Sequence, residues 1–597
     1  MRGEVFVHTP HPAGGLKPPR AGVSAGLRGA DGVRLDGAMH DSFFRPALWD
    51  ALRTYTRADF FKDLGAGLTV GIIALPLAIG FGIASGVSPA QGLWTAIIAG
   101  ALISALGGSR FQVGGPTGAF VPVLAGVVAA HGYAGLALAT MMAGVMLLLM
   151  GALRLGALLK FVPYPVVAGF TTGIAVMIFT AQLNEGLGLG LKMPEHVPQQ
   201  IAALAAHLGA ADGHALALVA LTFAILHGLP RLTKAVPPSI VAVVAATLLA
   251  WALGWPVATV GSKFGGIPAG LPGWHVPAIS LEAMRVLMAP AFTIAALGGI
   301  ESLLSATVAD GMTDTRHDSN QELIGQGLAN LLCPLVGGIA ATGAIARTAA
   351  NIRSGARTPV AGLIHAGVLL VIALVAAPLA KFIPLAALAA ILMAVALRMA
   401  EWENFRVLWH GPRTDFYVML AALGLTVVFD LTIGVGAGLV MAAVMFMKRM
   451  EEISSVRVLT PESDPEYDGS FSLRGKIVPE GVVLYRFTGP LFFAAADKLE
   501  AALRASGGKP RAVIFRMRYV PSMDATGLQV LRTAVEKMQR DGVLVLITGI
   551  QPQPMSVLHK SGNADAIGID NFCANLDEAL ERCRRLPGEP APAIKQG

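Results

Sequence analysis

A glycine-rich break separates two apolar stretches, where the chain reads Val113-Gly-Gly-Pro-Thr-Gly-Ala-Phe120. The centre of this motif recurs 225 residues later as Thr342-Gly343-Ala344. Each copy precedes a short run that predicts a helix beginning at the motif. Exposed N–H groups and the helix dipole both favour negative charge at such a helix start. Two of these starts inside a membrane would form an anion site.

The composition indicates a polytopic membrane protein. Of the 597 residues, 54% are hydrophobic and only 14% are charged, whereas about 25% are charged in soluble proteins. Long apolar runs recur between residues 64 and 447. The net charge of +7 follows from Lys and Arg beside these runs, because such residues tend to stay cytoplasmic. Nucleic acid is therefore not an expected partner, and the membrane lipid is.

Sequence signals for enzymatic or metal chemistry are lacking. Cys333, Cys573 and Cys583 do not have the spacing of metal ligands. No Walker loop, zinc motif or nucleophile elbow occurs in the sequence. We therefore expect no enzyme, no cofactor and no ATP-driven pump.

Fourteen apolar segments are predicted in a membrane domain that covers residues 51–450. Their approximate bounds are 64–83, 89–106, 117–131, 135–151, 163–183, 214–229, 237–254, 286–309, 321–340, 344–354, 359–379, 384–399, 414–430 and 431–448. Pro76 predicts a kink or local unwinding in the first segment. The third and tenth segments are too short for the ~20 residues of a full span. Residues 194–208 resemble an interfacial amphipathic helix.

The segments divide into two repeats. Besides the Thr-Gly-Ala copies, Gly86 matches Gly311 at the same offset, and residues 160–163 match 381–384 at an offset of 221. Seven segments per repeat is an odd number, so the two repeats would be inverted relative to each other. Chance similarity between apolar helices is the alternative.

The ends of the chain differ from the membrane domain. Residues 1–50 are rich in Gly, Pro and Arg and are predicted to be disordered, as is the tail 587–597. Basic residues before the first segment place the N-terminus in the cytoplasm, and an even number of spans places the C-terminus there too. Residues 465–586 predict a small cytosolic α/β domain. Its expected strands are 482–494, 512–518 and 543–549, and its expected helices are 495–506, 526–541, 553–561 and 576–585.

Glu301 and Arg347 are the charged candidates for chemistry. A carboxylate inside a membrane segment normally faces a polar cavity or a partner, so Glu301 is predicted to bind a proton or coupling cation. Its alternative is a structural carboxylate between helices. Arg347 follows the second motif and could provide the counter-charge for an anion. Its alternatives are an ion pair with Glu301 or a helix-end arginine that reaches the interface.

Other candidates have plainer alternatives. Thr117 offers a hydroxyl, and Gly114, Gly115 and Gly118 allow close backbone approach. Phe81 and Phe120 could form an apolar wall, although membrane phenylalanines more often pack against lipid or core. Asp310 and residues 314–318 are predicted to form a solvated loop.

The turn at residues 522–527 begins a predicted helix in the C-terminal domain. Asp524 and Thr526 could present a surface to a cytosolic protein partner or bind phosphate. The plainer alternative is that one of them caps the helix.

Together these motifs resemble the SulP family of anion transporters, the sulfate-permease type with a C-terminal STAS domain. The resemblance covers about residues 60–585. It rests on residues 63–71 leading to Pro76, on the motif ending at Phe120, on Gly355-Ala-Arg-Thr-Pro359 and on Met523-Asp-Ala-Thr-Gly527.

The resemblance implies a core and a gate domain formed by two inverted seven-helix repeats, with half-length third and tenth helices whose starts face each other. Transport would be an elevator-like movement, and a homodimer is expected. By motif position, the residues that line the substrate site would be Thr117, Gly118, Ala119, Phe120, Ala344, Ile345, Ala346 and Arg347, with Glu301 nearby.

Two departures from the family pattern bear on substrate and coupling. Leu77 stands where many members carry Gln after the proline. Glu301 stands where sodium-coupled bicarbonate members use Asp, and the hydroxyl residue that they carry near position 345 is replaced by Ile345. These changes favour protons over sodium. Ala525 replaces a serine that is phosphorylated in related domains, so only Thr526 could be modified there.

The function expected from these features is proton-coupled symport of a small anion, most simply sulfate, across a bacterial cytoplasmic membrane. Bicarbonate and C4-dicarboxylates such as fumarate or succinate are the rival substrates. A membrane-anchored STAS regulatory protein is the alternative of another class. A nucleobase permease of the same fold is disfavoured, because a cationic site and a STAS domain both point to anions.

Overall fold

The structure, a computed structural model, describes residues 44–586 apart from 158–161, 195, 234–235, 268–269, 271, 275, 401, 461–462, 465–471, 493–497, 500 and 504–509. Most of the predicted disordered N-terminus, all of the tail 587–597, and most of the predicted helix 495–506 lie outside these residues. The prediction of disorder was wrong for residues 47–50, because they begin the helix α1.

The membrane part consists mainly of helices. In its first half the helices are α1 Ala47–Arg53, α2 Arg57–Ala84, α3 Pro89–Leu106, α4 Val121–Ala152, α5 Tyr164–Gly186, α6 Val197–His207, α7 Gly213–Leu232, α8 Pro238–Ala252 and α9 Val260–Phe264. In its second half they are α10 Leu281–Thr313, α11 Ser319–Leu332, α12 Ile345–Arg353, α13 Val360–Val375, α14 Leu385–Met399, α15 Trp402–His410, α16 Arg413–Val428 and α17 Leu431–Ile453. The predicted interfacial helix is α6.

Local sequence sets where these helices begin. Thr56 accepts from the backbone of Asp59, whose side chain accepts in return, and this capping box begins α2. Ser88 and Gln91 form the same box at α3, with Pro89 in the first turn. Both helices therefore begin where a hydroxyl residue satisfies N–H groups that a helix leaves unpaired.

Every predicted segment contains a helix, but the number of spans stays a prediction. Among the described residues, seven helices are long and apolar enough to cross a membrane, and three apolar helices are shorter. The third and fourth predicted segments are joined in α4, which is interrupted at Gly132 with a φ of 66°. Because a left-handed φ does not continue a helix, the first part of α4 is short, as predicted.

Two predicted boundaries differ from the structure. The third helix was expected to begin at residue 117, but a 3₁₀ turn over Gly118–Phe120 precedes α4. The ninth segment was expected to reach residue 340, but α11 ends at Leu332. Pro334 lacks an N–H group and ends the α-helix, and a 3₁₀ turn over Cys333–Val336 follows it. At Pro76 the helix α2 continues without unwinding, so of the two expectations there only a kink stays a prediction.

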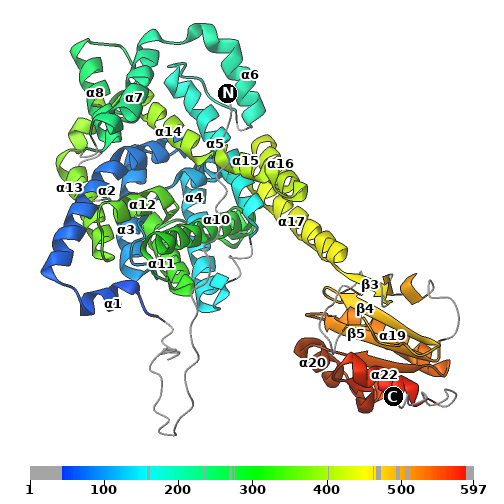
Figure 1. The fold of residues 1–597 in the computed structure, drawn as a ribbon. Helices are drawn as coiled ribbons and strands as arrows, with labels where there is room; N and C mark the ends of the chain where they lie inside the picture. Colours follow the sequence, from blue (N-terminus) through cyan, green and yellow to red (C-terminus); the bar gives the residue numbers. More distant parts are fainter. Residues whose placement is uncertain are drawn as a thin grey trace, which may run out of the picture. The chain divides into compact units, whose positions relative to one another are not determined.

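Small residues allow the helices to pack closely. A Cβ atom added to Gly67 would lie 2.7 Å from the Ala361 carbonyl, and one added to Gly71 would lie 2.8 Å from Val368 Cγ1. Both glycines lie on α2 and face α13. Close backbone approach of this kind is typical of helix pairs in membranes. Figure 1 shows α2, α3, α4, α10, α11 and α12 gathered in one cluster.

The C-terminal domain is a five-stranded sheet with helices. The strand order is β3 Ser455–Val458, β4 Val482–Thr488, β5 Ala512–Tyr519, β6 Leu544–Thr548 and β7 Phe572–Cys573. The pair β3–β4 is antiparallel and the other pairs are parallel. Its helices include α19 Ala525–Arg540, α20 Pro552–Lys560, α21 Asn563–Ile567 and α22 Leu576–Arg584 (Figure 1).

Side chains of β5 alternate between two hydrophobic clusters. Val513 and Phe515 belong to one cluster, whereas Ala512 and Ile514 belong to the other. Both faces of the sheet are therefore covered, as is usual for parallel strands. The sheet also includes β3, which precedes residue 465, the predicted beginning of this domain.

Candidate functional site

The two copies of the repeated motif lie side by side. Gly114 and Gly115 form strand β1, which pairs antiparallel with strand β2, Thr342 and Gly343. The Ala344 N–H extends the pairing by donating to the Val113 carbonyl at 3.0 Å. Each strand leads directly towards a helix start, so the structure brings together the two segments that the sequence singled out.

The arrangement strongly favours glycine at position 115. Its φ of 141° lies in a region that other residues rarely adopt. A Cβ atom added there would lie 2.5 Å from Arg347 Nη1 and 3.3 Å from Ala96 Cα. The backbone of the first motif therefore approaches Arg347 so closely that it leaves no space for a side chain.

Arg347 binds the first motif. Its guanidinium donates to the Gly114 carbonyl at 3.2 Å and to the Pro116 carbonyl at 2.5 Å. The residue is 4% exposed, so it does not reach towards an interface. These bonds use two of the five N–H donors of the guanidinium. A buried cation thus lies at the junction of the two motifs, with donors that the backbone does not use.

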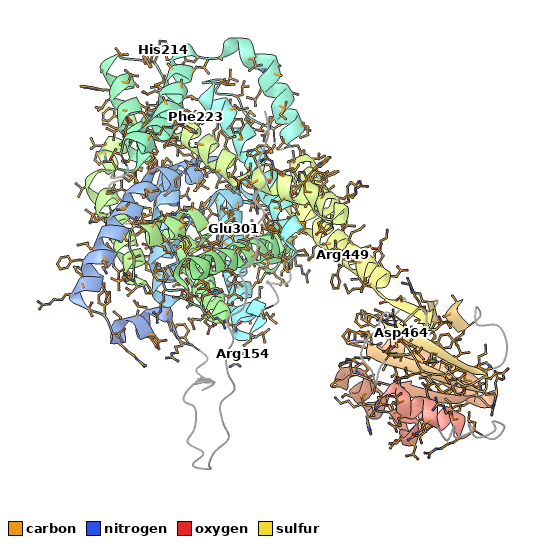
Figure 2. All side chains as sticks on the ribbon, viewed as in Figure 1. Arg154, His214, Phe223, Glu301, Arg449 and Asp464 are labelled. Atoms are coloured by element: carbon orange, nitrogen blue, oxygen red, sulfur yellow. The ribbon has the colours of Figure 1, made fainter. Side chains whose placement is uncertain are left out.

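Glu301 lies on α10 beside the first motif, inside the helical part of the molecule (Figure 2). Its carboxylate accepts a 3.0 Å hydrogen bond from the Thr117 hydroxyl. The charges of Glu301 and Arg347 attract each other, although the guanidinium donates its hydrogen bonds to backbone carbonyls. Glu301, Thr117 and Arg347 therefore form one polar group within an apolar protein.

The first helix start is closely packed. Ala119 and Phe120 are both 1% exposed. Phe120 packs against α10, where its Cζ lies 3.1 Å from the position of a Cβ on Gly298. Phe81 Cε1 lies 3.4 Å from the position of a Cβ on Gly118. Phe120 thus packs the end of the first motif against α10, and Phe81 packs against Gly118 within the motif.

The second helix start is more open. Ala344 is buried, but Ile345 is 42% exposed and Ala346 is also exposed. Both exposed residues belong to the first turn of α12, where N–H groups lack helical partners. Of the two starts, this one has the more exposed residues.

Glu322, on α11, was missed by the sequence interpretation. It is fully buried, and one of its oxygens accepts from the N–H groups of Gly108 and Ser109 at 2.9 and 3.0 Å. The other accepts from Gln112 Nε2 at 2.9 Å. The sequence signal for a buried carboxylate was that Glu322 directly precedes an apolar run. Its polar neighbours Asn320 and Gln321, however, are also typical of a solvated helix start.

Asp63, on α2, also has a defined place. Its carboxylate accepts from the Arg357 N–H at 2.6 Å and from the Thr358 hydroxyl at 2.6 Å. The Tyr55 hydroxyl donates to it at 3.2 Å. Burial and the Asp63 charge raise the pKa of Tyr55 to about 12, which keeps this donor protonated. The two sequence motifs that contain Asp63 and Thr358 are therefore bound to each other in the fold.

The loop after α10 is not simply solvated. Asp310 belongs to the last turn of α10 and accepts from the backbone N–H of His317 at 3.1 Å. The His317 ring lies 2.7 Å from the same carboxylate, and its side chain is 5% exposed. The expectation of a solvated loop was wrong for these two residues. The described residues contain no group of three or more His, Cys, Asp or Glu that could hold a metal.

In the C-terminal domain, Asp524 caps α19. Its carboxylate accepts from the Gly527 N–H at 2.7 Å, which agrees with the plainer alternative. Thr526 is exposed in the first turn of that helix. A role of this turn in partner binding stays a prediction.

Two family models match the chain. The model described as the sulfate permease family matches residues 60–422, and that of the STAS domain matches residues 476–579. These matches agree with the family resemblance drawn from the motifs.

Two curated proteins are similar over nearly their whole length. The chain is 42% identical over 528 residues to "Putative sulfate transporter YvdB" of Bacillus subtilis, covering 88% of this chain and 98% of that protein. It is 33% identical over 556 residues to "Bicarbonate transporter BicA" of Picosynechococcus sp., covering 90% and 98%.

Solved structures share the fold. A structure titled "The overall structure of SLC26A9" superposes with a TM-score of 0.81 at 17% identity, covering 90% of this chain and 92% of that one. A second, titled "The transmembrane domain of a cyanobacterium bicarbonate transporter BicA", gives a TM-score of 0.59 at 35% identity, covering 64% and 99%. The predicted fold, a helical membrane domain followed by a STAS domain, is confirmed.

Proposed function

This chain belongs to the sulfate permease family of anion transporters, and we propose that it carries sulfate across a bacterial cytoplasmic membrane by proton-coupled symport. The observation that carries the proposal is the pairing of β1 with β2. This pairing brings α12 close to the first motif, to which Glu301 is bonded through Thr117. The partial positive charge of the helix start and the full charge of Arg347 then lie near the carboxylate of Glu301.

Sulfate fits the chemistry of this group. A tetrahedral dianion can accept from several N–H groups at once, and the first turn of α12 together with Arg347 offers such donors. The Bacillus relative named as a sulfate transporter supports sulfate, whereas the cyanobacterial relatives named as bicarbonate transporters support bicarbonate. C4-dicarboxylates remain the third candidate class.

Glu301 is the proposed proton-binding residue. An anion arriving beside a carboxylate is repelled, and protonation of Glu301 removes that repulsion. The Thr117 hydroxyl can donate to the ionised carboxylate or accept from the protonated one. Because a proton and an anion then favour each other's binding, they would cross the membrane together.

An elevator-like movement is the proposed transport step. The two motifs are joined by backbone pairing and by the two bonds of Arg347. A site bound together in this way moves as one body, rather than opening between its halves. We further propose a homodimer with both termini in the cytosol.

Uptake by purified protein in proteoliposomes tests the proposal. Labelled sulfate, bicarbonate and succinate are each offered with an inward proton gradient and without one. We expect the protein to take up sulfate, and to do so faster with the inward proton gradient than without it. Uptake of another anion instead would contradict sulfate as the substrate. Uptake that does not depend on the gradient would contradict proton coupling. If removal of residues 465–597 left uptake unchanged while the full chain bound a cytosolic protein, the STAS domain would have a separate regulatory role.

A further inference from the structure

Glu322 lies outside the candidate anion site, yet its contacts reach both sides of it. We infer that Glu322 is a positioning residue that sets the spacing between the first motif and the Glu301-bearing turn of α10. The inference rests on the proposed function, because it concerns the site at which the anion would bind. Glu322 itself contacts neither Arg347 nor the start of α12.

The surroundings of Glu322 consist of donors. One oxygen accepts from the Gly108 and Ser109 N–H groups. The other accepts from Gln112 Nε2 at 2.9 Å, from Gln326 Nε2 at 3.1 Å and from the Ser302 hydroxyl at 3.3 Å. An ionised carboxylate is an acceptor only and can satisfy several donors on each oxygen. The five donors thus match the ionised form.

Apart from Gln326, which lies on α11 with Glu322, these donors come from two segments, the connection between α3 and the first motif and the helix α10. Gly108 and Ser109 follow α3, Gln112 directly precedes the first motif, and Ser302 directly follows Glu301 on α10. The turn after α3 packs closely against the beginning of α11, because a Cβ on Gly108 would lie 2.1 Å from the Asp318 carbonyl, and the Asp318 N–H donates to the Gly108 carbonyl at 3.2 Å. Glu322 therefore binds the entry of the first motif to α11.

Gln112 is the link that reaches the site. Its amide donates to the Ser302 hydroxyl at 2.7 Å as well as to Glu322. It also lies against the second motif, since a Cβ on Gly343 would meet Gln112 Nε2 at 2.0 Å. Both motifs and the turn carrying Glu301 thus meet at one amide, and Glu322 fixes the orientation of that amide.

Glu322→Gln should release this link without unfolding the protein. The new carbonyl oxygen can still accept from the Gly108 and Ser109 N–H groups. The new NH₂ group would face Gln112 Nε2 and Gln326 Nε2, both donors. The side-chain oxygens of Gln112 and Gln326 are buried without a partner, so a flip of either amide would satisfy the new NH₂. A flip of Gln112 would then lose its bond to the Ser302 carbonyl, which can only accept, and would reverse its bond to the Ser302 hydroxyl.

The test is a double-mutant cycle in proteoliposomes, using the anion that the wild-type protein transports best. We expect Glu322→Gln to raise KM about tenfold and Ser302→Ala about threefold, with little change in kcat, because small displacements of a site cost this much. The double variant should resemble Glu322→Gln alone, since both changes break one link. Glu282→Gln, an exposed glutamate on α10, should match the wild type.

Additive effects of the two substitutions, or a Glu322→Gln variant with wild-type KM, would overturn the inference. Deuterium exchange gives a readout that does not need transport. We expect faster exchange in peptides covering residues 111–120 of Glu322→Gln, and unchanged exchange in α16 and α17. Unchanged exchange at 111–120 would also overturn it. A wild-type protein that transports none of the three anions would refute the proposed function, and the exchange experiment would still decide the role of Glu322.

Discussion

The two motifs of the site share a backbone arrangement but differ in what they expose. The first motif is closely packed, with Ala119 and Phe120 almost fully buried, and it offers backbone carbonyls to Arg347. The second motif carries the arginine and an accessible helix start at Ile345. Duplicated sequences can therefore differ within one site, because the first copy binds Arg347 through its carbonyls and the second carries Arg347 together with an exposed helix start.

The largest effect should come from the first motif. Gly115→Ala forces a left-handed φ on a residue with a Cβ and brings that atom within 2.5 Å of Arg347 Nη1. We expect uptake to fall on the order of a hundredfold, because Arg347 must move, and the unfolding free energy to fall by about 1–3 kcal/mol. Proteoliposome uptake and thermal unfolding measure the two effects.

The matched control for that substitution is Gly126→Ala on α4, where nothing lies within 4 Å of the added atom. It should be neutral or slightly stabilising. A Gly115→Ala variant with normal uptake would show that the first motif does not hold Arg347 during transport.

Arg347→Lys should have the next largest effect. A lysine keeps the charge, but its single nitrogen lacks the fork that reaches both the Gly114 and Pro116 carbonyls. We expect at least a tenfold rise in KM for the transported anion, measured by uptake. Arg353→Lys, an exposed arginine at the end of the same helix, is the control. Equal KM values for the two lysine variants would mean that charge alone suffices at position 347.

Thr117→Val tests how the first motif contributes to coupling. It removes the hydroxyl that donates to Glu301, and a hydrogen bond to a charged group contributes about 1.5–3 kcal/mol. We expect the acceleration of uptake by a proton gradient to shrink at least severalfold, whereas Thr117→Ser should keep it. If valine at position 117 left the gradient dependence intact, Glu301 would act without its threonine partner.

The smallest effect should come from the exposed side chain of the second motif. Ile345 is predicted to line the site, but its backbone N–H is the polar group at the helix start. Ile345→Ala leaves this N–H unchanged, so we expect KM to change by less than about twofold. A larger change in KM would show that the Ile345 side chain contacts the substrate. The second motif would then contribute a side chain as well as backbone N–H groups.

The sequence predicted most of this arrangement, because hydropathy and repetition are visible without coordinates. Glu301 stood out as a single carboxylate within an apolar segment, and the Thr-Gly-Ala copies marked where the repeats meet. The helix ends that differed, at Val121 and Leu332, depend on short 3₁₀ turns that leave little trace in hydropathy.

The connections between distant segments could not be predicted. Glu322 was not among the candidates from sequence, because only the fold brings Gly108 and Ser302 within reach of it. Arg347 was expected to provide the counter-charge for an anion, yet its guanidinium binds two carbonyls of the first motif. These bonds depend on how two distant segments pack together, which the local sequence does not show. Partners chosen by tertiary folding lie beyond what composition and spacing determine.

The bonds of Arg347 also have a consequence for biosynthesis. Arg347 and its acceptor Pro116 are 231 residues apart. At the usual 5–20 residues per second of translation, the first motif is made on the order of ten seconds or more before its partner. During that time its carbonyls lack their cation inside the bilayer, so we expect the nascent first repeat to depend on the insertion machinery or a chaperone until the second arrives.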